Sequence, residues 1–178
     1  MNKKITCSVM AIIAMVLTMA SSMTSNNGNP LRFSQKAMEV MGNAEGCRRD
    51  PYLCPAGVIT QGIGHTGSGV KSGLQEASNE QIAIWFALDQ MEAQNCIERN
   101  VERKIGKELP QGVFDGVGSF VFNVGCSKFL SSTMYKNLID EKFTEACNWL
   151  PKWIYANGIK LEGLVKRRQE ERALCLTF

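Results

Sequence analysis

Seven cysteines set the first limit on how this 178-residue chain can fold. Six of them lie between residues 47 and 175, and the seventh, Cys7, lies in an apolar segment near the N-terminus. Disulfides persist in oxidising compartments, so most of these cysteines should pair if the chain is exported, and the odd number leaves one thiol over. The sequence has no CxxC pattern and a single histidine, His65, which argues against a zinc site. We therefore expect no metal and no other cofactor.

The N-terminal segment has the pattern of an export signal. Lys3 and Lys4 precede the uncharged run Ile5–Met23, and the next charged residue is Arg32. A run of 19 residues is roughly long enough for the ~30 Å core of a bilayer, but much of it is Thr, Ser and Ala. Three interpretations stay open: a cleaved signal peptide, a permanent anchor, and a weak anchor that can leave the membrane. A buried core helix is not expected, because the lysines stand where an export signal requires them.

The charges predict that the rest of the chain lies outside the cytoplasm and does not bind nucleic acid. Basic residues at the start of an apolar segment favour a cytoplasmic N-terminus. Removing Lys3 and Lys4 from the net charge of +3 leaves 3 − 2 = +1, which gives no basic surface for nucleic acid. The length suits one domain, expected at residues 32–178 after an N-terminal segment and linker at residues 1–31.

The domain is predicted to combine a small sheet with a larger set of helices. Apolar spacing predicts a helix from Ser34 to Glu45. Prolines and glycines then interrupt helical spacing, and β-favouring residues indicate a hairpin-like sheet within residues 48–66, followed by a loop at 67–73. Further helices are predicted at 82–99, 111–124, 134–139, 143–150 and 163–176, the last with Arg and Glu on one face and apolar residues on the other. This order indicates an α+β fold, with a small lobe at about 32–74, a helical lobe at about 75–178, and a ligand cleft between them.

Glu45 is the first candidate for catalysis, because a carboxyl at a helix end facing a cleft can act as a general acid. Cys54 follows after eight residues, and Thr60 after five more. This spacing, together with Gly62–Thr66 (GIGHT) and Phe122–Gly125 (FNVG), resembles the phage-type lysozymes, or endolysins, of glycoside hydrolase family twenty-four.

The resemblance, which covers about residues 34–176, implies a lysozyme-like fold and a muramidase activity. Such an enzyme cleaves the β-1,4 bond between N-acetylmuramic acid and N-acetylglucosamine in peptidoglycan and lyses the host. Glu45 would protonate the leaving oxygen, Cys54 would activate or orient a water where glycosidases usually carry a second carboxylate, and Thr60 would hold that water. Asp50 lies off the motif and is interpreted as structural, and His65 as a hydrogen-bonded neighbour of the site. Peptidoglycan is the expected partner of a monomeric chain.

The resemblance also suggests how Cys54 is controlled. Endolysins of the signal-arrest-release type keep a weakly hydrophobic N-terminal segment and stay inactive until it leaves the membrane. A Cys47–Cys54 disulfide would block the site, and attack by Cys7 on Cys47 after release would free Cys54. The plain alternative is a structural Cys47–Cys54 bond beside an inert Cys7. The signal-arrest-release scheme implies that residues 5–23 contact the host inner membrane and that the chain uses host secretion and thiol-oxidation machinery. Its final location would be the periplasm.

The other four cysteines are expected to hold the helical lobe together. We predict Cys96–Cys126 and Cys147–Cys175, although four cysteines allow three pairings.

Three other functions remain open at this point. A lytic transglycosylase would use Glu45 alone and form an anhydro sugar. A peptidase or amidase would pair Cys54 or Cys47 with His65. A wall-binding module would have no turnover at all.

Overall fold

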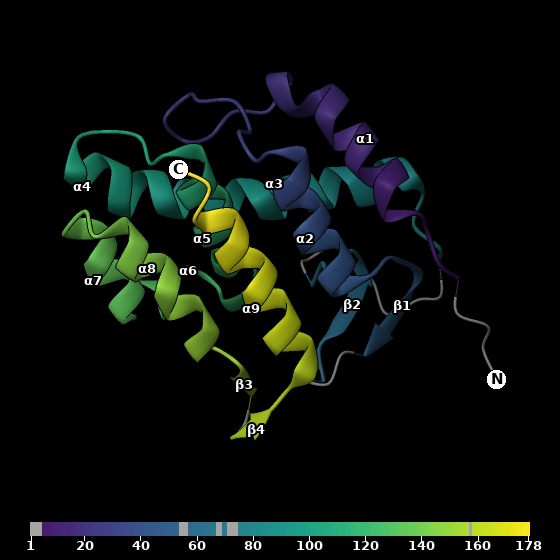
Figure 1. The fold of residues 1–178 in the computed structure, drawn as a ribbon. Helices are drawn as coiled ribbons and strands as arrows, with labels where there is room; N and C mark the ends of the chain where they lie inside the picture. The colour runs from purple at the N-terminus through teal and green to yellow at the C-terminus, as the bar shows by residue number, and fades with distance from the viewer. Residues whose placement is uncertain (1–4, 54–56, 67–68, 71–74, 157) are drawn as a thin grey trace.

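The computed structural model describes residues 5–53, 57–66, 69–70, 75–156 and 158–178, which form a mostly helical domain with two small antiparallel sheets (Figure 1). The helices are α1 (Val9–Met19), α2 (Gln35–Glu45), α3 (Asn79–Ile97), α4 (Arg103–Ile105), α5 (Gln111–Val124), α6 (Cys126–Leu130), α7 (Thr133–Ile139), α8 (Phe143–Trp149) and α9 (Glu162–Cys175). A π-helical turn (Glu98–Glu102) follows α3, and 3-10 turns follow α1 (Ala20–Ser22) and α8 (Leu150–Lys152). The strands are β1 (Arg48–Leu53), β2 (Ile59–Gly62), β3 (Tyr155–Ala156) and β4 (Ile159–Lys160).

The small lobe is a helix that turns directly into a hairpin, which confirms the two elements predicted there. The Ser34 hydroxyl caps α2 by accepting a hydrogen bond from the Ala37 amide at 3.2 Å. The helix ends at Gly46, whose φ of +71° lets the chain reverse into β1. β1 then pairs antiparallel with β2, with Tyr52 opposite Thr60.

The helical lobe is built around α5, which packs against α2, α3 and α9. Its Phe114 and Phe120 are fully buried. α9 approaches α5 closely at Gly116, where an added Cβ would lie 2.5 Å from the Cβ of Cys175. A side chain at Gly116 would therefore push the two helices apart.

The N-terminal segment is part of the core, which corrects the expectation that it would not be a buried helix. α1 lies across α2 and α3 (Figure 1) and buries Ile12, Ile13 and Val16 completely. Val9 of α1 packs so closely on Gly42 of α2 that a Cβ there would lie 2.5 Å from its Cγ1. The flanking lysines indicated an export signal, but they say nothing of where the apolar side chains lie in the folded chain. Among the residues placed in the structure, no helix has both the length and the apolar character that a membrane crossing needs.

In the described part of the chain, three disulfides join elements that are distant in sequence. Cys96 on α3 bonds to Cys126 on α6, and Cys147 on α8 bonds to Cys175 on α9, so both predicted pairs in the helical lobe are confirmed. The third bond joins Cys7 to Cys47, with their Cα atoms 5.1 Å apart. It ties the segment before α1 to the start of the sheet.

Candidate active site

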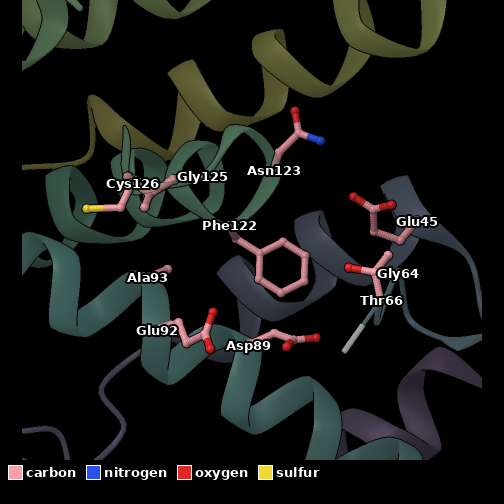
Figure 2. Close-up of a pocket in the computed structure, with 11 residues that line it drawn as sticks. Glu45, Gly64, Thr66, Asp89, Glu92, Ala93, Phe122, Asn123, Gly125 and Cys126 are labelled. Carbon is pink, nitrogen blue, oxygen red and sulfur yellow. The ribbon is translucent and has the colours of Figure 1, made fainter. Parts of the chain in front are cut away.

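The candidate site is a cavity of about 360 Å³ between the small lobe and the helical lobe, where the sequence placed a cleft (Figure 2). The residues that line it include Glu45, Thr66, Asp89, Glu92, Phe122 and Asn123. They come from the end of α2, the segment after β2, α3 and α5. The wall thus combines three carboxylates with an aromatic ring and an amide, which suits a polar sugar with apolar faces.

Glu45 is the last residue of α2, and its side chain reaches the cavity with about a quarter of its surface exposed (26%) (Figure 2). Its Oε1 accepts a hydrogen bond from Nη1 of Arg167 at 2.5 Å. The other oxygen, Oε2, lies beside Gly64, where an added Cβ would stand 3.1 Å away. The carboxyl group is therefore bounded on both sides by residues far apart in sequence.

Arg167 is held by a buried charge network on α9. Glu171 is fully buried, and its Oε1 accepts hydrogen bonds from Nε of Arg167 at 3.0 Å and from the Ser119 hydroxyl at 2.8 Å. Its other oxygen pairs with Arg168, which in turn donates to the side chain of Asn123. Burial lowers the pKa of Arg168, and the Glu171 carboxylate opposes that shift. Two guanidinium groups and two carboxylates, those of Glu45 and Glu171, balance in charge, as buried ions must.

This network corrects the interpretation of α9 as a helix with a charged face set apart from an apolar one. Arg167, Arg168 and Glu171 are buried, whereas Leu164 and Val165 are only partly buried. The bounds of this helix were predicted correctly to within about one residue, but the face that packs inward was not. The adjacent basic pair Arg167-Arg168 is visible in the sequence, but no local pattern indicated that both side chains are buried.

Of the other two sequence-predicted catalytic residues, the structure describes only Thr60, and it does not bring Thr60 to the wall of this cavity. Thr60 lies on β2, is 3% exposed, and donates from Oγ1 to the carbonyl of Val58 at 3.1 Å. It is absent from the wall of the cavity as the placed residues outline it. Cys54 lies outside the described residues.

His65 pairs with Asp89, a cavity residue that sequence reasoning did not single out. Its Nδ1 lies 2.9 Å from Oδ2 of Asp89, and its ring stacks on Trp85 with the centroids 4.9 Å apart. Burial raises the pKa of Asp89, and the hydrogen bond from His65 opposes this rise. His65 is thus the hydrogen-bonded neighbour expected from the sequence. Its Nδ1 is directed to Asp89, and Cys47 is bonded to Cys7, which leaves the pairing of Cys47 with His65 for a peptidase without support.

A family model described as "Phage lysozyme" matches residues 42–171, which include the cavity and the α9 network. The chain belongs to the phage lysozyme family. It is therefore a lysozyme-type glycoside hydrolase, and its fold is the lysozyme-like α+β fold expected from the sequence.

Relatives of this phage lysozyme share most of its length. A SAR-endolysin of Escherichia phage P1 is 36% identical over 182 residues, covering 96% of this chain and 91% of that protein. A SAR-endolysin of Haemophilus phage HP1 is 32% identical over 191 residues, covering 99% of each.

Two solved structures of one endolysin resemble the phage lysozyme to different degrees. The active form of P1 phage endolysin Lyz superposes with a TM-score of 0.81 at 36% identity, covering 97% of this chain and 96% of that one. The secreted inactive form of the same endolysin superposes with a TM-score of only 0.56 at 38% identity, covering 82% and 96%.

Proposed function

We propose that this phage lysozyme is an endolysin that hydrolyses the β-1,4 bond between N-acetylmuramic acid and N-acetylglucosamine and thereby lyses the host. The observation that carries the proposal is Glu45, a carboxyl in the cavity between the lobes, fixed through Arg167. The same cavity offers Phe122 and Asn123 as contacts for a sugar. Names of relatives support the biological role, since they are endolysins of phages.

In the proposed mechanism, Glu45 gives its proton to the glycosidic oxygen as the bond from that oxygen to C1 of the muramic acid breaks. Water adds its oxygen to C1 and loses a proton. Cys54, as a thiolate, is proposed to orient this water and accept the proton, and Thr60 to order the water network. Each sugar then carries a new hydroxyl group, so the atoms balance without any cofactor.

A digest of purified Gram-negative peptidoglycan, with products identified by mass spectrometry, tests this function. The full chain should release reducing-end muropeptides, and Glu45→Gln should lower the rate by at least about a hundredfold. Glu39→Gln is the matched control, because it removes a carboxylate from the same helix, outside the cavity, and should leave the rate unchanged. Anhydro sugars would indicate a lytic transglycosylase, cut stem peptides would indicate Cys–His chemistry, and no products would indicate a binding module.

The proposal extends to regulation. We propose that the chain is exported with residues 5–23 in the inner membrane and a Cys47–Cys54 disulfide over the site. After release into the periplasm, Cys7 forms a disulfide with Cys47 by thiol–disulfide exchange, which frees Cys54. Two observations support this order: the Cys7–Cys47 bond, and the closer likeness to the active than to the inactive form of the P1 endolysin.

Cys7→Ser tests the regulation separately from the catalysis. The variant should be exported and released but should digest peptidoglycan only when mild reductant is added, whereas the parent should be active without reductant. Activity of Cys7→Ser equal to that of the parent, without reductant, would leave the Cys47–Cys54 bond as an ordinary structural one.

A further inference from the structure

The segment before α1 adds a short strand to the edge of β1. Residues 5–7 run antiparallel to residues 47–49. The amide of Cys7 donates to the carbonyl of Cys47 at 3.2 Å, and the amide of Arg49 donates to the carbonyl of Ile5 at 2.7 Å. Two backbone hydrogen bonds therefore hold this segment in one alignment.

The alignment decides which cysteines meet. Thr6 stands opposite Arg48, and because antiparallel partners have residue numbers with a constant sum, Cys7 stands opposite Cys47. A slip of one residue would turn Cys7 to the other face of the strand. The disulfide between Cys7 and Cys47 is thus a product of strand register as well as of thiol chemistry.

Asp50 fixes the outer end of this strand. Its Oδ1 accepts the amide of Ile5 at 3.0 Å, beyond the last backbone hydrogen bond of the pair. Arg48 holds the carboxylate in place through its guanidinium group, which also lies 4.4 Å above the ring of Tyr52. The hydrogen bond from Arg48 also lowers the pKa of Asp50. An acceptor of this kind, off the catalytic motif, has no evident task in sugar hydrolysis.

We propose that Asp50 is a positioning residue for activation: it seats the released N-terminal segment in the register that directs the thiolate of Cys7 to the sulfur of Cys47. This inference rests on the proposed release and thiol exchange. In that step the Cys7–Cys47 bond forms, the Cys47–Cys54 bond breaks, and Cys54 leaves as a thiolate that takes up a proton. The Cys7 thiol has lost one proton, so the exchange needs no oxidant or reductant. Attack on Cys54 would instead give Cys7–Cys54 and keep the site blocked.

The test follows the partition of Cys7 between its two possible partners in the full chain. After export in Gram-negative cells, thiols are alkylated at successive times, and non-reducing peptide mapping gives the ratio of Cys7–Cys47 to Cys7–Cys54. Asp50→Asn, which keeps an oxygen but loses the charge, should lower this ratio about threefold, and Asp50→Ala about tenfold. Asp140→Asn, which changes an exposed aspartate paired with Lys142, is the control and should match the parent.

A second background separates positioning from catalysis. In a Cys7→Ser, Cys47→Ser variant no disulfide can cover Cys54, so adding Asp50→Ala should leave the rate of peptidoglycan digestion unchanged. A fall in that rate would overturn the inference, because Asp50 would then serve the reaction or the fold. An unchanged partition in Asp50→Ala, with normal Cys7–Cys47 formation in the parent, would overturn the inference alone. A parent that forms no Cys7–Cys47 bond after release would overturn the proposed regulation, and the inference with it.

Discussion

At the scale of single residues, the Glu45 carboxyl has little freedom to move. Arg167 holds one oxygen, and the backbone at Gly64 closes on the other. Gly64 also has a φ of +75°, a conformation that costs L-residues about 1–2 kcal/mol. Glycine is therefore favoured at this position for two independent reasons, one steric and one conformational.

Gly64→Ala should lower kcat for peptidoglycan digestion by at least about tenfold, because the new methyl group displaces the Glu45 carboxyl. It should also lower Tm through backbone strain. Gly163→Ala on α9 is the control, since nothing lies within 4 Å of a Cβ built there. Full activity in Gly64→Ala would show that the carboxyl position is not critical.

Asp115 should give the free energy of unfolding a measurable dependence on pH. Burial raises its pKa above 3.8, although its Oδ1 accepts hydrogen bonds from the Ser34 amide and the Gln111 side chain. The folded chain therefore keeps a proton that the unfolded chain has lost, so the contribution of Asp115 falls as pH rises from 3.8 through the folded pKa. Asp115→Asn removes this titration. Its stability relative to the parent should rise with pH over that window in urea unfolding, and parallel curves would contradict the assignment.

At the scale of elements, α9 links the carboxyl of Glu45, the proposed general acid, to the interior of the helical lobe. Its buried Arg167 contacts α2 through Glu45 and α5 through the carbonyl of Ser119. Arg168, one residue on, contacts Asn123 of α5 and donates from Nε to the Trp153 carbonyl at 3.1 Å. The charge pairs made by Arg167 on α9 thus set the position of the Glu45 side chain on α2.

Arg168→Met should lower the free energy of unfolding by about 3–5 kcal/mol, because it leaves the buried Glu171 carboxylate with a single guanidinium partner. Arg172→Met, on the exposed side of the same helix, should change it by less than about 0.5 kcal/mol. Urea denaturation followed by circular dichroism gives both values. Equal midpoints for the two variants would mean that the network adds no stability.

At the scale of the whole molecule, α1 completes the core that α2 and α3 begin. Ile13→Ala should therefore lower the free energy of unfolding of the folded chain by about 2–5 kcal/mol, through lost burial and the cavity it leaves. Leu17→Ala, at a side chain that is 40% exposed, should cost distinctly less. Similar values in urea unfolding would show that α1 is only loosely attached.

Local patterns in the sequence predicted most of the elements. The cap at Ser34, the breakers after Glu45 and the apolar spacing of α3 and α5 each act within a few residues, so the helices and the hairpin at β1 and β2 were predictable. The strands β3 and β4, with two residues each, are too short to give such a pattern. The apolar run Ile5–Met23, which contains α1, has a composition found both in export segments and in protein cores, so composition alone could not choose between them.

Only the part of the site that follows from a local sequence pattern could be predicted. Glu45 was found through its spacing to Cys54 and Thr60, a pattern within 16 residues. Arg167 stands 122 residues from Glu45, and no local pattern reports a contact at that separation. Asp89 likewise meets His65 only through the packing of α3 beside the segment after β2.

Ile12, Ile13 and Val16 are completely buried in the folded chain, and under the proposed regulation the same side chains would first lie in lipid. Apolar side chains are about equally stable among hydrocarbon tails and in a packed core, but only the core requires a particular side-chain shape. Isoleucine and leucine have the same atoms and nearly the same hydropathy, so exchanging them at position 13 would leave the hold of the membrane unchanged and weaken the fit in the core. Under the proposed regulation, the time of lysis would then depend on where a side chain branches, through its fit in the core, and not on its hydrophobicity.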